Sequence, residues 1–205
     1  ISDGATQWMT AGSGILHKEM HGRDYARRGG PFEMLQLWVN LPAKSKMTSP
    51  RYQALLDLDI PVAKLPGEAG SVRVIAGEFE GAKGPARTFT PINLFDLRLH
   101  ARHGASLDLR EGWTAAIFVL KGKVSVNGEA ANEGEVVVFK REWGEVSIQA
   151  ESDAALFVMN GQPLDEPIAG YGPFVMNTQE QIRQAFVDYQ GGRLGGILND
   201  ALAPA

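Results

Sequence analysis

The chain has 205 residues, with 20 basic and 24 acidic side chains, and its formal net charge is −4. Hydrophobic residues make up 44% of it, which excludes intrinsic disorder and allows a sizeable core. The lack of cysteine excludes disulfides, thiolate metal ligands and cysteine nucleophiles. There is no run of Lys and Arg and no apolar run of membrane-spanning length, so we expect neither nucleic-acid binding nor membrane insertion. No signal-peptide pattern opens the sequence, and the expected location is the cytoplasm.

Short alternating or apolar segments, separated by 24 glycines and 11 prolines, predict strands rather than long helices. The predicted strands, in chain order, cover residues 35–41, 95–101, 116–120, 123–126, 135–139 and 155–159. Asn127-Gly128 predicts a tight hairpin turn after the fourth of them. Four prolines between Pro42 and Pro66 predict an irregular connection, with one helical turn near Ser49.

One longer helix is predicted near the end of the chain. Thr178 and Gln181 form a capping-box pattern, apolar residues follow at helical spacing, and Gly191 ends the segment. Many short strands with a single helix are typical of an antiparallel sandwich or barrel. The sequence therefore predicts an all-β fold with a short C-terminal helix.

The first candidate site is the pair His17 and Glu19. In an extended segment after Gly14, these two side chains point to the same side. An imidazole and a carboxylate on one strand make half of a site for a divalent transition metal. The spacing alone leaves a surface pair or a buried ion pair open as alternatives. His21 follows at the same parity, but Gly22 indicates that the strand has already turned.

Three segments resemble signatures of the pirin family within the cupin superfamily: residues 7–19, residues 35–53 and residues 172–178. The resemblance extends from residue 1 to about residue 195. It implies a bicupin, in which two antiparallel β-barrels of the cupin or jelly-roll type follow one another. The implied division is residues 1–55 for the remaining part of the N-terminal metal-binding domain, 56–70 for a linker, 71–195 for a metal-free C-terminal cupin domain, and 196–205 for a tail.

The resemblance also implies the ligands of one metal ion. The N-terminal barrel of the family binds it through a His-x-His pair and a later His-x-Glu pair. His17 and Glu19 match the second pair. The first pair has no counterpart in this chain, so two further histidine ligands are expected upstream of Ile1, and the first barrel is expected to be incomplete. Iron(II) is the expected metal, with copper, nickel, cobalt, manganese and zinc as alternatives.

An internal comparison of the two barrels tests whether the second barrel could also bind a metal. It sets Asp108, Arg110, Ser147 and Gln149 at the positions of the four metal ligands. Arg carries a permanent positive charge and has no lone pair to donate, so this set is a poor metal site. We therefore expect the C-terminal barrel to hold no metal.

The resemblance implies a quercetin 2,3-dioxygenase-like enzyme that opens a flavonol ring with O₂, with Glu19 as the catalytic base. The alternative is a non-enzymatic, metal-dependent regulator that acts through contacts with a protein partner. One fold and one metal site can serve both functions. Because half of the ligand set is missing, we expect this chain alone to be inactive.

Overall fold

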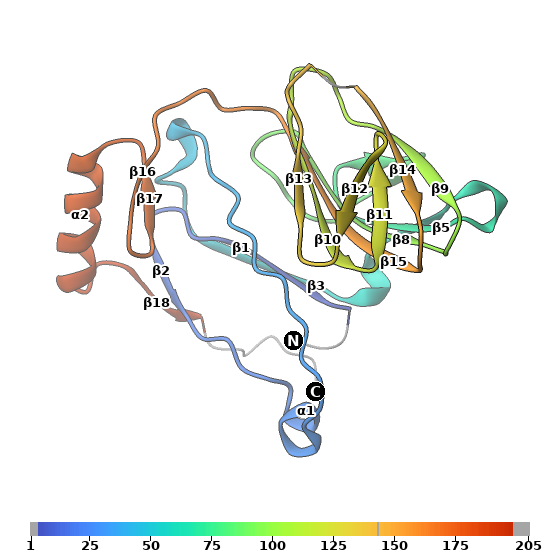
Figure 1. Ribbon diagram of the computed structural model, residues 1–205. Helices are drawn as coiled ribbons and strands as arrows, with labels where there is room; N and C mark the ends of the chain where they lie inside the picture. The colour runs from blue at the N-terminus through green and yellow to red at the C-terminus, as the bar shows by residue number, and fades with distance from the viewer. Residues whose placement is uncertain (1–3, 143, 199–205) are drawn as a thin grey trace. The chain divides into compact units, whose positions relative to one another are not determined.

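The computed structural model describes residues 4–142 and 144–198, and of residues 196–198 it describes the backbone (Figure 1). The chain divides into two compact units. One unit combines Ile1–Ala54 with Leu164–Ala205, and the other is the continuous segment Leu55–Pro163. Most of the described elements are strands, which confirms the all-β prediction.

The segment Leu55–Pro163 folds into two antiparallel sheets around a single core. The larger sheet has the strand order β13-β10-β15-β8-β5-β4. Its members are β4 (Val62–Lys64), β5 (Gly70–Ala76), β8 (Ile92–Leu99), β10 (Thr114–Lys121), β13 (Val136–Val138) and β15 (Ala154–Gly161). The smaller sheet has the order β12-β11-β14-β9 and consists of β9 (Gly104–Asp108), β11 (Lys123–Val126), β12 (Glu129–Asn132) and β14 (Glu145–Ala150). Two short strands, β6 (Glu78–Phe79) and β7 (Ala82–Lys83), form a hairpin beside them.

Alternating side chains explain the packing of these sheets. In β10 every second residue is buried, and the same alternation runs through β14. The core combines inward-facing residues of both sheets, as expected for a sandwich. The predicted core residues Phe95, Leu97, Leu99, Ile117 and Val119 are all buried, and Phe139 packs against them from a partly buried position.

The local predictions for this unit are confirmed. Strands occupy all or most of the five predicted segments after residue 90. Asn127 and Gly128 both adopt positive φ, 51° and 87°, and connect β11 to β12 as a tight turn. Positive φ at both central residues matches the right-handed twist of the flanking strands.

The other unit consists of small paired elements. β1 (Thr6–Thr10) pairs with β3 (Arg51–Leu55), whose last residue falls in the second unit, and β2 (Ile15–His17) pairs in parallel with β18 (Gly195–Leu198). β16 (Ala169–Tyr171) and β17 (Phe174–Met176) form a hairpin, and the helices are α1 (Arg23–Arg28) and α2 (Gln179–Gln190). Single 3₁₀ turns occupy Ala43–Ser45, Asp57–Asp59 and Pro66–Glu68, the last two of them in the second unit.

Helix α2 confirms the predicted capping box. The Gln181 backbone N–H donates to Thr178 Oγ1 at 3.2 Å, and Gln181 Oε1 accepts from the Thr178 N–H at 3.0 Å. The buried side of the helix carries Ile182, and the Phe186 ring packs against Phe174 with ring centroids 4.9 Å apart. The apolar stripe therefore fixes the helix onto the β16–β17 hairpin. None of the described helices is long and apolar enough to cross a membrane.

Two predictions for the N-terminal third are wrong. Residues 35–41 form no strand, and Leu35, Leu37 and Val39 are each 40% exposed. Alternation makes a strand only when a neighbouring strand supplies hydrogen bonds, and within the described ranges no strand pairs with this segment. The helical turn expected near Ser49 is also absent, because the residues from Arg51 onward extend into β3 and pair with β1.

The packing groups some segments differently from the predicted division. Residues 56–70 were expected to form a linker, yet β4 lies within them and pairs with β5. Residues 164–195 were expected in the C-terminal domain, yet they cluster with the N-terminal unit. The two compact units are defined by contacts within the structure, whereas the predicted domains are defined by the family resemblance. The predicted domain boundaries therefore stay a prediction. Of the expected tail, residues 196–198 end β18, and the remainder lies outside the described residues.

Candidate metal centre

A tight turn positions the residues of the candidate site. Gly12 has φ +52°, and a Cβ there would lie 2.1 Å from the Thr48 carbonyl oxygen. Gly14 has φ +112°, and its Cβ would lie 2.4 Å from Leu194 Cδ2. Only glycine tolerates both the positive φ and the close approach. The two glycines therefore direct the chain into β2, which ends at His17.

The structure brings His17 and Glu19 together. His17 Nε2 lies 3.8 Å from Glu19 Oε1, and the two side chains are 42% and 40% exposed. Donors on one metal ion at about 2.1 Å lie roughly 3 Å from each other, so small rotations would let both reach the same ion. The pair fits a metal as two of its ligands, one neutral nitrogen and one anionic oxygen.

The pair does not form a complete metal site by itself. Within residues 4–142 and 144–198, no group of three or more His, Asp or Glu side chains converges as metal ligands would. His21, the next histidine, instead packs its ring edge-on against Phe32 at 4.7 Å and tilted against Tyr25 at 5.4 Å. The described part of the chain thus brings two candidate metal ligands together and no third.

A buried lysine in the same unit was missed at the level of sequence. Lys46 is only 4% exposed, and its Nζ donates to Asn40 Oδ1 at 2.7 Å and to the Val175 carbonyl at 3.0 Å. Burial lowers the pKa of Lys46, and the nearby Glu166 carboxylate opposes part of that shift. A lysine between polar loop residues gives no signal of burial, because one of its two partners, Val175, lies 129 residues away in sequence.

Glu166 extends this network. Its Oε2 accepts from the Ala43 backbone N–H at 2.6 Å and from Asn177 Nδ2 at 3.3 Å. These bonds join the segment that follows residue 40 to the segment that ends at Asn177. Ala43 and Asn177 both lie in segments on which the family resemblance rests. The hydrogen bonds of Glu166 therefore show one structural role for these two segments, which is to hold each other in place.

In the second unit, four residues were compared with the metal ligands of the first barrel. Asp108, Arg110, Ser147 and Gln149 are exposed, whereas the core-facing neighbours are apolar and buried: Leu107, Leu109, Val146 and Ile148. The four compared side chains therefore do not point into the core of the sandwich. Arg110 instead lies over the Trp113 ring, with the guanidinium carbon 5.1 Å from the ring centroid.

Comparison with known families agrees with this architecture. The family profile "Pirin C-terminal cupin domain" matches residues 94–195, and the profile "Pirin" matches residues 1–39. The two packed antiparallel sheets and the match to the cupin-domain profile thus define a β-protein of the cupin class.

Relatives narrow the class further. The chain is 48% identical over 193 residues to "Putative quercetin 2,3-dioxygenase PA2418" of Pseudomonas aeruginosa, covering 94% of this chain and 68% of that protein. It is 39% identical over 203 residues to "Pirin-1" of Arabidopsis thaliana, covering 95% of this chain and 67% of that protein. A crystal structure of quercetin 2,3-dioxygenase from Acinetobacter baumannii matches with a TM-score of 0.92 and 47% identity, over 95% of this chain and 68% of that one. The chain belongs to the pirin family.

Proposed function

We propose that this protein is a metal-dependent dioxygenase that opens the ring of a flavonol such as quercetin with O₂. The observation that carries the proposal is the His17–Glu19 pair, 3.8 Å apart, in a chain 48% identical to a relative named for this activity. The structure that matches with a TM-score of 0.92 carries the same name. The chain spans about two thirds of these relatives, so the activity is proposed for the complete gene product.

His17 and Glu19 would hold the metal, with iron(II) first among the candidates and copper, nickel, cobalt, manganese and zinc as alternatives. The remaining ligands would come from residues outside the described ranges, and the family pattern makes them two histidines upstream of Ile1. When bound, the ion would supply Lewis-acid stabilisation for a substrate oxygen anion.

Glu19 has a second proposed role, as the base. Its carboxylate would accept the proton of the flavonol 3-hydroxyl, which makes the substrate electron-rich toward O₂. His17 would present the lone pair of a ring nitrogen to the metal, which only the neutral imidazole carries. About 40% exposure leaves both side chains accessible to a substrate and to solvent protons.

The test is an aerobic quercetin assay on the complete gene product after loading with each candidate metal, with O₂ uptake and loss of flavonol absorbance followed together. His17→Ala should lower metal content and turnover together. Glu19→Gln should lower turnover by about 10²-fold or more, since positioned proton transfer typically contributes that much. His100→Ala, an exposed histidine of the other unit, is the matched control and should behave as the unmodified protein. Full turnover by His17→Ala would refute the site.

A metal-dependent regulator is the second candidate, and one observation favours it. Several large apolar side chains of the segment after α1 are exposed, including Phe32 at 57%, Met34 at 50% and Trp38 at 63%. Exposed apolar patches commonly mark contacts with other polypeptides. Metal binding without turnover by the iron, copper, manganese, cobalt and nickel forms would favour this function over the enzyme.

A further inference from the structure

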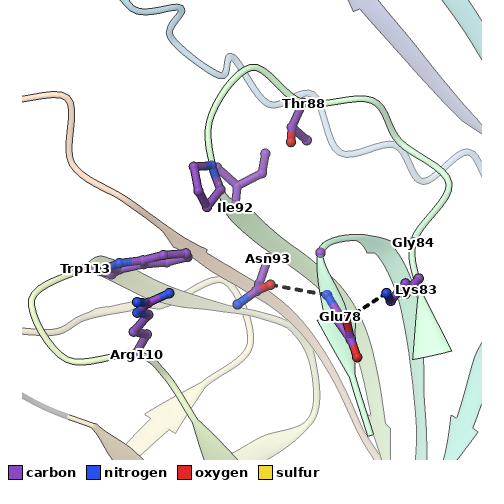
Figure 2. A pocket seen from close by; sticks show the side chains of 10 residues that line it. Glu78, Lys83, Gly84, Thr88, Ile92, Asn93, Arg110 and Trp113 are labelled. Carbon is purple, nitrogen blue, oxygen red and sulfur yellow. Dashed lines mark hydrogen bonds and ion pairs between the residues drawn. The ribbon is translucent and has the colours of Figure 1, made fainter. Parts of the chain in front are cut away.

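The second unit contains a pocket remote in sequence from His17 and Glu19. Its volume is about 530 Å³, within the range of pockets that hold small molecules. Residues from four parts of the chain line it, among them Glu78, Lys83, Ile92, Asn93, Arg110 and Trp113. Figure 2 shows Arg110 with Trp113 on one side and Glu78 with Lys83 on the other, with Asn93 between them.

The charges of the lining do not cancel. Lys83 Nζ lies 3.6 Å from Glu78 Oε2, so these two groups largely neutralise each other. Arg110 contacts the Trp113 ring, and no carboxylate of the described chain lies within ion-pairing distance of it. The guanidinium therefore leaves the pocket with one uncompensated positive charge, and its N–H groups form a planar fork that matches a carboxylate.

The floor of the pocket is fixed by hydrogen bonds. Asn93 Nδ2 donates to Asn160 Oδ1 at 3.3 Å, and Asn160 Nδ2 donates to the Thr114 carbonyl at 3.2 Å. Asn93 Oδ1 accepts from the Glu78 backbone N–H at 3.4 Å. Gly77 permits this contact, because a Cβ there would lie 2.0 Å from Asn93 Oδ1. A polar floor held in one orientation costs a ligand little ordering entropy.

We propose that this pocket binds a small planar carboxylate with an aromatic body. Arg110 would take the carboxylate through its fork, and Trp113 and Ile92 would contact the apolar rings. The ligand would carry one negative charge rather than two, because one arginine supplies the only uncompensated cation among the described lining residues. A metal ion is disfavoured in the same place, since arginine repels it and donates no lone pair.

The probe for the test is naphthalene-2-carboxylate, added to the whole 205-residue chain. Titration calorimetry gives the affinity, and ¹⁵N-resolved NMR locates the site through the Trp113 indole N–H and the Asn93 side-chain amide. We expect saturable binding with shifts of both signals. The uncharged amide of the same ring system should bind at least about tenfold more weakly, because it lacks the charge-assisted bonds.

Variants of the arginine separate charge from geometry. Arg110→Gln should weaken binding at least about tenfold, and Arg110→Lys should fall between it and the unmodified chain, because lysine keeps the charge and loses the fork. Arg102→Gln is the matched control, an exposed arginine of the same unit that does not line the pocket, and should leave binding unchanged. Arg110 is itself exposed, so its variants should keep the native melting temperature. Unaltered affinity in Arg110→Gln, or shifts that miss Trp113 and Asn93, would overturn the proposal.

Discussion

Lys46 lies in a loop segment, yet its ammonium group is buried and donates to Asn40 and to the carbonyl of Val175. Burial penalises the charged form, and the hydrogen bonds keep the group in place. Because its pKa is lowered in the folded protein, the unfolded chain binds more protons between that lowered pKa and the usual value near 10.5. The free energy of unfolding should therefore rise with pH between the lowered pKa of Lys46 and 10.5. Below this range Lys46 is charged in both states, and the folded protein bears the full cost of burying the charge.

Lys46→Met is expected to remove this rise. Urea unfolding curves recorded at several alkaline pH values give the free energy of unfolding of each variant. The slope of this free energy against pH is then compared between the variants. Lys44→Met is the matched control, since Lys44 is an exposed lysine of the same loop, and it should keep the slope of the unmodified chain. Equal slopes in both variants would show that Lys46 does not titrate as inferred.

Asp96 is the buried charge of the larger sheet. Its carboxylate is paired with Arg73 at 3.0 Å and with Arg98 at 2.7 Å, while its side chain is only 10% exposed. Removing one partner of a buried ion pair leaves the other charge uncompensated. Arg73 is also paired with Asp57, whose side chain is 57% exposed, so the two aspartates share one arginine in different surroundings.

We expect Asp96→Asn to lower the free energy of unfolding by about 2–3 kcal/mol, and Asp57→Asn by less than about 1 kcal/mol. Chemical denaturation at neutral pH measures both. Both aspartates bind the Arg73 guanidinium, but Asp96 is more buried and also binds Arg98, so its loss should cost more. A loss from Asp57→Asn as large as that from Asp96→Asn would contradict this explanation.

Strands β8 and β10 form the centre of the larger sheet together with β15. Their inward side chains Leu97, Ile117 and Val119 are fully buried, so a truncation there removes transfer free energy and leaves a cavity. The edge strand β13 differs, since Val138 is 72% exposed. The loss of stability caused by truncating an apolar side chain in this sheet should therefore be large in a central strand and small in the edge strand.

Leu97→Ala and Leu99→Ala should each cost about 2–5 kcal/mol of stability, with a clear fall in melting temperature. Val138→Ala should change stability by less than about 0.5 kcal/mol. Thermal unfolding followed by circular dichroism compares the three variants. An unchanged melting temperature in both leucine variants would show that the inferred packing of β8 is wrong.

At the scale of the whole molecule, the ligand count decides the behaviour of the candidate metal centre. His17 and Glu19 provide two donors, and no third His, Asp or Glu joins them in the part of the chain described by the structure. Even a lost hydrogen-bond partner of a ligand typically lowers metal affinity or activity about 10–100-fold. If the centre needs four ligands, as the proposed function implies, a chain that supplies two should lose at least as much.

The isolated 205-residue chain is therefore expected to bind iron below one equivalent and to show little quercetin turnover. Elemental analysis of the purified chain, with the complete gene product as reference, measures the first quantity. One equivalent of iron on the isolated chain would require a ligand set different from that of the family. His21 would then be the first residue to replace.

The sequence by itself determined the features that depend on neighbours in the chain. The strand at residues 116–120, the Asn127-Gly128 turn and the Thr178 capping box all follow from local sequence pattern. The spacing of His17 and Glu19 also placed a nitrogen and an oxygen donor near each other. These features need contacts across only a few residues, so a local pattern is sufficient to predict them.

The tertiary structure decided the features that depend on distant partners. Residues 35–41 alternate like a strand but pair with no strand of the described chain. Lys46 is buried in a place where its ammonium group meets the carbonyl of Val175, a residue distant in sequence. The pocket at Arg110 likewise assembles side chains that lie up to 36 positions apart, from Gly77 to Trp113. Strand pairing and burial depend on which segments meet in space, and hydrophobic periodicity specifies a face without specifying what covers it.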